Sequence, residues 1–367
     1  DFTFDKLEPD SYEIKVIYEG DENIPANNGT TSIKIPRTSQ WPNVGNDPQN
    51  SGNSIATRGD GVSIIWEAAI NGDLRSSAII DSFGNVYVND GSKVYSFDSN
   101  GNLRWSGGVG TAGIAIFNDE LIFNSQANNA MIILNATTGQ NIGGNFWYAS
   151  SVCPAIFMDG KVYVVTQYGY NTGGGWSGNH WIDIFSYDGP NDYGVGVCDG
   201  IFIVEVTGIG YGASGVLAAP TFDKNGFVYV NTAKGFRIVN VETDAAVFSD
   251  TSIKALGRAV VDANNIAYIL EQNTQGIFAI NTEGIVWNVT VTGGIGSTLA
   301  VDNENGFLYS VNANGTLYKY STTDGSEIKV YDLNSTGVSI ILDADSNVYV
   351  STANGNVTAF NSDGDLL

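Results

Sequence analysis

Histidine, cysteine and basic residues are scarce in this chain of 367 residues, and each scarcity argues against a class of function. The single histidine, His180, excludes metal sites with several histidines and argues against histidine-based catalytic triads. Only 16 Lys and Arg oppose 39 Asp and Glu, which gives a formal charge of −23. Without a basic stripe to neutralise phosphates, we expect no binding to nucleic acid or to an anionic membrane. Because no run of about 18 apolar residues occurs, we also expect no membrane-spanning helix.

A repeat of roughly 40 residues fills the sequence from about Trp66 to Leu367. Each copy has an apolar run, a polar turn and an alternating strand, as in residues 78–88. An aromatic residue in the second strand marks the copies at Tyr87, Phe123, Tyr163, Tyr229, Tyr268, Tyr309 and Tyr349, in steps of 36, 40, 66, 39, 41 and 40 residues. Short strands and turns at this period are typical of β-propeller blades. We therefore predict an all-β chain with seven four-stranded blades.

The last copy predicts how the ring closes. Its third strand, residues 355–360, leads into a polar turn and the final residues, so its fourth strand is missing. Residues 62–70, around Trp66, form an apolar strand that has no blade of its own. Pairing this N-terminal strand with the last blade would remove two open sheet edges. Counting a hairpin around Phe202 as one more blade gives the alternative of eight blades.

Residues 1–37 read as two alternating strands joined by a polar loop, followed by a linker at 38–65 and the propeller at 66–367. A Tyr-x5-Tyr-x-Gly-Asp motif runs from Tyr12 to Asp21. It resembles the last two strands of the Ig-like repeats found in tandem on bacterial and archaeal surface proteins. The resemblance implies an incomplete Ig-like domain, since a lone hairpin is marginal in water. The chain begins at Asp1 without Met or a signal peptide, so we expect it to be a piece of a longer protein.

The segment from Trp41 to Gly52 matches W-P-x-x-x-x-D-x-x-x-S/T-G and resembles the opening of pyrroloquinoline-quinone-like (PQQ-like) propellers. The repeats that follow resemble the blades of the same family, within the WD40/YVTN-like superfamily, most clearly at residues 219–230. Together with the Ig-like strands, this arrangement resembles the adhesin-like surface proteins of methanogenic archaea. The PQQ-like family includes quinone dehydrogenases, an outer-membrane assembly scaffold, sensor domains and adhesins. The resemblance therefore implies a fold more than a function.

Residues for catalysis or metal binding are not evident in the repeats. Quinone-dependent members of the family clamp the cofactor with adjacent cysteines or a Trp floor and with calcium, whereas Cys153 and Cys198 are far apart here. The starts of the first strands read Ser-Ser-Ala, Ala-Ala-Pro, Gly-Arg-Ala and Gly-Ser-Thr, which offer no general base. The acidic stretches 302–306 and 343–347 fall where blades need turns and lack the Glu of a calcium loop. We expect no catalytic residue, metal or cofactor.

The third copy takes 66 residues and departs from the repeat in two segments, 167–181 and 189–215. Loops on rigid scaffolds commonly carry binding, and exposed aromatic residues stack on sugars or anchor protein partners. We predict a ligand-binding loop that contains Tyr168, Tyr170, Trp176, His180 and Trp181. The alternative is a hairpin, or extra outer strands, whose aromatic residues pack on the ring. Cys153 and Cys198 flank this region and form either a disulfide or two separately buried thiols.

The composition is acidic, rich in Thr, Asn and Gly and low in Lys and Cys, and it favours an exported protein. Candidate N-glycosylation sequons occur at Asn28, Asn135, Asn288, Asn314, Asn334 and Asn356. We predict a non-catalytic, cell-surface recognition or adhesion module that is monomeric and binds a glycan or a protein. The alternative is an enzyme on a propeller scaffold, either a quinone-dependent dehydrogenase or a glycan-active enzyme that uses paired carboxylates.

Overall fold

The computed structural model describes the chain except residues 1–10, 19–26, 35–46, 48, 53, 55–63, 73–77, 109–112, 118, 126–129, 147–149, 152–155, 159–160, 172–175, 187–198, 210–219, 233, 244 and 297. The chain divides into two compact units, Asp1–Ser39 and Gln40–Leu367. In the first unit, β1 (Ser11–Tyr18) pairs antiparallel with β2 (Asn27–Lys34). The two strands predicted from residues 1–37 are therefore confirmed.

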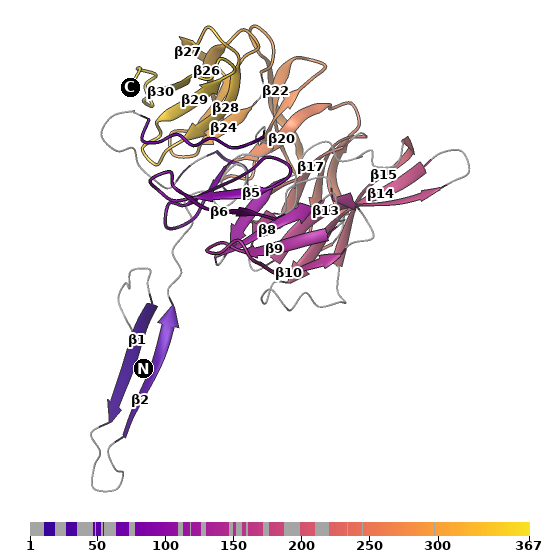
Figure 1. Ribbon diagram of the computed structural model, residues 1–367. Helices are drawn as coiled ribbons and strands as arrows, with labels where there is room; N and C mark the ends of the chain where they lie inside the picture. The colour runs from indigo at the N-terminus through magenta and orange to yellow at the C-terminus, as the bar shows by residue number, and fades with distance from the viewer. Residues whose placement is uncertain are drawn as a thin grey trace. The chain divides into compact units, whose positions relative to one another are not determined.

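The second unit is a series of antiparallel sheets, each made from strands that follow one another in the chain (Figure 1). The first three sheets are β3 (Ile79–Ile80), β4 (Val86–Asn89), β5 (Val94–Phe97) and β6 (Leu103–Gly107); β7 (Ile114–Phe117), β8 (Glu120–Ser125), β9 (Ala130–Asn135) and β10 (Asn141–Phe146); and β11 (Ser150–Ser151), β12 (Ile156–Met158), β13 (Lys161–Asn171), β14 (Trp176–Ser186) and β15 (Asp199–Ile209).

Four further sheets complete the unit within the described residues. They are β16 (Thr221–Phe222), β17 (Phe227–Thr232), β18 (Gly235–Asn240) and β19 (Ala245–Asp250); β20 (Ala255–Val261), β21 (Ala267–Glu271), β22 (Gly276–Asn281) and β23 (Gly284–Thr290); β24 (Leu299–Asp302), β25 (Phe307–Val311), β26 (Thr316–Ser321) and β27 (Glu327–Asp332); and β28 (Gly337–Leu342), β29 (Val348–Thr352) and β30 (Val357–Phe360). The all-β prediction is confirmed, and no helix in the described part is long and apolar enough to cross a membrane.

The first strands of successive sheets lie side by side. Strand β3 contacts β7, and β7 contacts β12; further along the chain, β16 contacts β20, β20 contacts β24, and β24 contacts β28. At these junctions the sheets meet through strands at their starts, and the later strands of each sheet extend away from the contact. This is the relation between neighbouring blades of a β-propeller.

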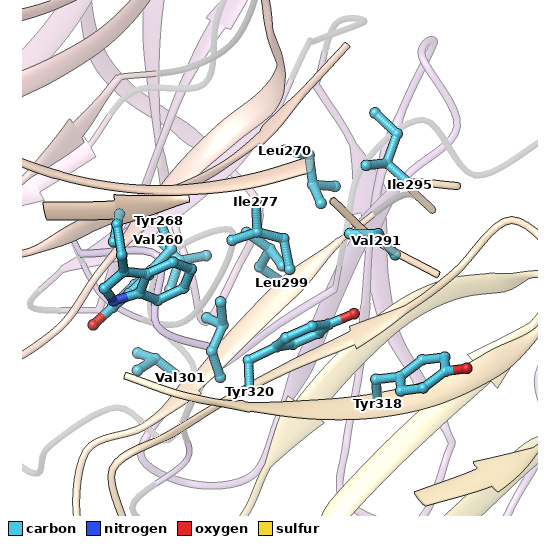
Figure 2. Packing of buried hydrophobic residues seen from close by; sticks show 13 residues of the cluster. Val260, Tyr268, Leu270, Ile277, Val291, Ile295, Leu299, Val301, Tyr318 and Tyr320 are labelled. Atoms are coloured by element: carbon cyan, nitrogen blue, oxygen red, sulfur yellow. The ribbon is translucent and has the colours of Figure 1, made fainter. Parts of the chain in front are cut away.

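The core lies between neighbouring sheets. One cluster joins β20–β23 to β24–β27, with Tyr268 and Ile277 from the first sheet and Leu308 and Tyr320 from the second, all nearly inaccessible to solvent. Figure 2 shows the side chains of this cluster directed toward one another. Because each sheet buries apolar residues against the next one, the repeats stabilise one another through nearest-neighbour contacts.

Tryptophans of the outer strands pack on glycines of the next sheet. The Trp287 ring lies 2.7 Å from the position of a Cβ at Gly325, and its indole N–H donates to the Thr322 carbonyl at 2.8 Å. Trp105 lies in the same way over Gly139 and donates to the Ala136 carbonyl at 2.9 Å. Both glycines have positive φ, so the turn and the ring contact both favour glycine.

The last sheet has three strands, and the described strand pairs do not include the predicted pairing of residues 62–70 with it. Residues 64–70 carry no strand, and Phe360 of β30 instead forms a bridge with Leu366. Trp66 packs on the first sheet, stacked on Phe97 with ring centroids 6.0 Å apart and lying over Gly101. The chain turns back at 361–365, which lets Leu366 take the first position beside β30.

Candidate binding site

The acidic residues of the turns are committed to the fold. In four sheets, an aspartate Oδ1 accepts the backbone N–H groups two and four residues later, and its Oδ2 accepts a tyrosine hydroxyl at 2.9 Å. The pairs are Asp81–Tyr87, Asp223–Tyr229, Asp262–Tyr268 and Asp343–Tyr349. These aspartates are buried. They close hairpins, as the sequence predicted for 343–347, and they do not gather into one site.

The copy that contains Tyr309 lacks this bond. Its turn, from Asp302 to Tyr309, is one residue longer than in those four copies, and the buried Tyr309 hydroxyl has no hydrogen-bond partner in the described structure. Burial raises the pKa of the Tyr309 hydroxyl, and the charge of Asp302 raises it further. Burial also raises the pKa of Tyr268, with Asp262 as the second cause. Both phenols therefore stay protonated at neutral pH and cannot act there as bases.

The oversized third copy forms three long antiparallel strands, β13, β14 and β15, which together we call the hairpin. Strands β13, β14 and β15 have 11 residues each, whereas the strands of the other sheets in this unit have at most 7. Strand β11 pairs with β13 at Thr166 and Gln167, and β12 pairs with it at residues 161–163. Residues 168–171 of β13 pair only with β14 among the described strands. The hairpin therefore continues beyond the part of the sheet that the first strands cover.

The five predicted binding residues lie in strands β13 and β14, so the segment forms paired strands and their assignment to a loop is wrong. Tyr168 and Tyr170 lie in β13, opposite Asn179 and Ser177; Trp181 in β14 lies opposite Thr166. Because strand residues alternate between faces, these three aromatic positions fall on one face of the hairpin.

Trp176 and His180 lie opposite Asn171 and Gln167, which places them on the other face. The register therefore separates the five residues into two sets. The loop assignment failed because the segment has the composition of a loop, rich in Gly and Asn, although its alternation continues that of the strands before it.

The alternative of an eighth blade was built on a hairpin around Phe202. Phe202 lies in β15, which pairs with β14 in the same sheet as β13. Cys153 and Cys198 lie outside the described residues. In the part of the chain that the structure describes, no three His, Cys, Asp or Glu side chains are grouped as metal ligands.

A short segment that sequence reasoning identified only as a family motif makes specific contacts. We call this segment, Asp47, 49–52 and Ser54, the strap. Its carbonyls accept hydrogen bonds from the first strands of three successive sheets: Gln49 from Val261, Ser51 from Val301 and Gly52 from Leu342, at 2.8 to 3.1 Å. The Asn50 carboxamide adds a bond to the Ala259 carbonyl at 3.1 Å. The strap thus links β20, β24 and β28.

The contacts of Asp47, Ser51 and Gly52 explain why these three residue types occur in the motif at 41–52. The Asp47 carboxylate accepts the Ser51 backbone N–H at 2.8 Å and the Ser51 hydroxyl, which closes a turn. Burial raises the pKa of Asp47, while the bonds from Ser51 and the nearby Arg258 act in the opposite direction. A Cβ at Gly52 would lie 3.2 Å from the Ala300 Cβ, and the Gly52 φ is +71°. Arg258 comes from the Gly-Arg-Ala start of β20 and donates to the Pro220 carbonyl at 3.3 Å.

Comparison with known proteins supports the fold. A family model described as "Outer membrane protein assembly factor BamB" matches residues 275–367. The crystal structure of BamB from Moraxella catarrhalis is 14% identical, with 81% of this chain and 85% of that chain covered and a TM-score of 0.58. The fold is BamB-like.

Two other solved structures show the same likeness. Sqt1 of Saccharomyces cerevisiae is 12% identical, with coverage of 77% and 81% and a TM-score of 0.54. The dihydro-heme d1 dehydrogenase NirN, in complex with DHE, is 9% identical, with coverage of 80% and 65% and a TM-score of 0.59. No curated protein matches the sequence. The chain therefore shares a β-propeller-like repeat fold with proteins of different activities.

Proposed function

We propose that this chain is a non-catalytic recognition module of a cell-surface protein and binds a glycan or protein ligand through the hairpin β13–β14–β15. The observation that carries the proposal is the length of these strands, 11 residues each in a unit whose other sheets have strands of at most 7. The aspartates and tyrosines that recur in the other sheets hold turns. The hairpin extends beyond the length that the repeat requires, and it is rich in aromatic residues.

The finer architecture belongs to the same proposal. We infer seven blades, because seven sheets follow the N-terminal hairpin in the described part and β15 joins the third of them. We also infer that residues 62–70, the segment of Trp66, complete the last blade. Trp66 lies over Gly101 as Trp105 lies over Gly139 and Trp287 over Gly325, and those two tryptophans belong to the fourth strand of the preceding sheet.

Removal of the Trp66 side chain tests ring closure. Trp66→Ala should reduce the free energy of unfolding by about 3 kcal/mol or less, because Trp66 is partly buried and truncating a fully buried Trp costs about 3–5 kcal/mol. In the same variant, hydrogen exchange at Val357–Phe360 should accelerate more than at β16–β19, because the inferred closing segment loses the ring that anchors it to the first sheet. Equal exchange in both sheets would contradict closure through this segment.

The cell-surface location is supported by composition and similarity. The matched family model is named for an outer membrane assembly factor. The chain carries a charge of −23 and two cysteines, and residues 1–37 resemble the end of an Ig-like domain of surface proteins. We expect a monomer, with a glycan or another surface protein as the partner.

The test is a glycan and surface-protein array, followed by variants that separate the two faces of the hairpin. One variant carries Tyr168→Ala, Tyr170→Ala and Trp181→Ala, and the other carries Trp176→Ala and His180→Ala. If one face binds, one variant should lose binding at least 30-fold, since an aromatic anchor contributes about 2 kcal/mol or more, while the other retains it. Both variants should keep the melting temperature nearly unchanged.

The control is Trp105→Ala, which removes a ring that packs between sheets. Because Trp105 is partly buried, the variant should reduce the free energy of unfolding by about 3 kcal/mol and leave ligand affinity unchanged under conditions where the protein is folded. If the hairpin variants lose stability as Trp105→Ala does, and binding persists at low temperature, the aromatic residues are structural and the proposed site is wrong.

An enzyme on the same scaffold is the second candidate, because the similar structures include a dehydrogenase. A quinone or glycan substrate would then be turned over. Titration with pyrroloquinoline quinone and calcium discriminates the two functions. The recognition module should give no saturable absorbance change and no oxidation of alcohols or sugars, whereas micromolar quinone binding would favour the enzyme.

A further inference from the structure

The sequons differ in their side-chain contacts and in whether they lie in a turn or a strand, and these two differences together select two of them. Asn334 and Asn356 are both exposed, and no described residue hydrogen-bonds to either carboxamide. Their hydroxyl partners, Thr336 and Thr358, are likewise at least partly accessible and make no side-chain hydrogen bond to a described residue. Asn334 lies in the connection between β27 and β28, and Asn356 ends the turn between β29 and β30.

Two other sequons are engaged in the fold through their side chains, and a third lies inside a strand. The Asn135 carboxamide oxygen accepts the Thr137 and Thr138 N–H groups and the Thr138 hydroxyl, at 2.9 to 3.2 Å. The hydroxyl of the Asn314 sequon, Thr316, is buried and donates to Asp332 at 2.7 Å.

The Asn314 carboxamide nitrogen lies against Gly293, 2.7 Å from the position of a Cβ there. Asn288 lies inside β23 opposite Phe278, and not in a turn. Asn135 and Asn314 would have to leave their places to present a free carboxamide and hydroxyl together, whereas Asn288 and Thr290 are exposed but lie in a paired strand. The side chain of Asn28 lies outside the described part.

The two free sequons also adjoin one another. The Ala353 N–H, in the turn before Asn356, donates to the carbonyl of Thr336 at 2.9 Å. Strands β28 and β29 therefore bring both acceptors to the same end of the last sheet. At this end the turn between β29 and β30 meets the connection that enters β28, whereas the strap binds near the opposite end of β28, at Leu342.

We propose that Asn334 and Asn356 carry N-linked glycans, which form a paired glycan patch on the last sheet. The carboxamide nitrogen attacks the anomeric carbon of a sugar donor activated as a diphosphate ester. The bond from that carbon to the diphosphate oxygen breaks, the diphosphate leaves with the electron pair, and the amide proton passes to a base of the transferase. The proposal rests on the surface location proposed above, because the donor and transferase act on exported chains.

The test is glycopeptide mass spectrometry of the chain expressed in its own cells and recovered folded. Peptides with Asn334 and Asn356 should carry added sugar mass, whereas peptides with Asn135, Asn288 and Asn314 should be bare. Asn334→Gln and Thr336→Ala should each remove the first glycan, and Thr336→Ser should retain it. Asn356→Gln and Thr358→Ala should remove the second. Asn135→Gln should leave the glycan mass unchanged.

Bare peptides at both sites, or sugar equally at all the sequons, would overturn the proposal. The Thr336→Ala and Thr336→Ser pair keeps the result independent of folding, because the asparagine is intact in both. Ligand binding on the array uses unglycosylated protein, so the two proposals fail separately. If Asn334 and Asn356 carry no sugar on an exported protein, only the glycan proposal is rejected. If the protein binds nothing on the array while both asparagines are glycosylated, only the recognition function is rejected.

Discussion

At the scale of single residues, the chain offers a natural comparison between a satisfied and an unsatisfied buried hydroxyl. Tyr268 donates to Asp262 at 2.9 Å, while Tyr309, at the matching place in the next sheet, has no hydrogen-bond partner among the described residues. Both rings are at least 98% buried, so packing is nearly the same in the two sites. The difference between them isolates the value of one hydrogen bond to a buried carboxylate.

We expect Tyr268→Phe to reduce the free energy of unfolding by about 1–3 kcal/mol, because a buried carboxylate oxygen loses its donor. Tyr309→Phe should change it by less than about 0.5 kcal/mol or increase it, since the lost hydroxyl is already unsatisfied. Chemical denaturation of the two variants at neutral pH provides the measurement. Equal losses would mean that Tyr309 has a partner, such as a bound water.

At the scale of elements, the strap and the hairpin have opposite relations to the repeat. The strap is outside the repeat and ties three sheets together through their first strands. The hairpin belongs to one sheet and extends beyond the length that the other sheets use. The strap should therefore determine stability, and the hairpin should be tolerant of substitution.

Gly52→Ala tests the strap. The Gly52 φ of +71° costs an alanine about 1 kcal/mol, and its Cβ would press on Ala300 at 3.2 Å and on the Ile340 carbonyl at 3.3 Å. We expect a loss of about 2 kcal/mol or more. Gly226→Ala is the matched control, with φ of +80° and open space around the Cβ. It should lose only the roughly 1 kcal/mol that a positive φ costs an alanine. Identical melting temperatures for the two variants would show that the strap contact is not a stabilising one.

At the scale of the whole molecule, the buried tyrosines predict an alkaline limit. Burial is the largest cause of a raised pKa for Tyr87, Tyr229, Tyr268, Tyr309 and Tyr320. A raised pKa in the folded state means that the folded chain holds these protons more tightly than the unfolded chain. Their contribution is therefore fully present below the unfolded value of about 10 and is lost as pH rises above it.

Stability should accordingly fall steeply above about pH 10, where the unfolded chain releases the phenolic protons. Spectrophotometric titration near 295 nm, a wavelength at which tyrosinate absorbs, should show a group of tyrosines that ionise only as the β-sheet signal disappears. If all 18 tyrosines titrated together before unfolding, the buried hydroxyls would have to be accessible.

Much of the architecture could be predicted from local pattern. The Asp-to-Tyr spacing, the polar turns and the alternating strands are short-range features, and the structure has the predicted strands at Val86–Asn89, Phe227–Thr232 and Val348–Thr352. The site was less predictable. Tyr168 and Trp176 were assigned to a loop from composition, whereas pairing across eleven residues extends the strands through them.

The sequence by itself determined the repeat, the strand content and the turn chemistry, because hydrogen bonds within a hairpin join residues only a few positions apart. Tertiary structure decided the rest. Gln49, Ser51 and Gly52 meet Val261, Val301 and Leu342 across more than 200 residues, and no local pattern encodes such a partner. The same holds for the sequons, since only packing decides that Thr316 is buried against Asp332 while Thr336 stays exposed. Contacts between distant segments depend on how the sheets are stacked, which is a property of the whole chain.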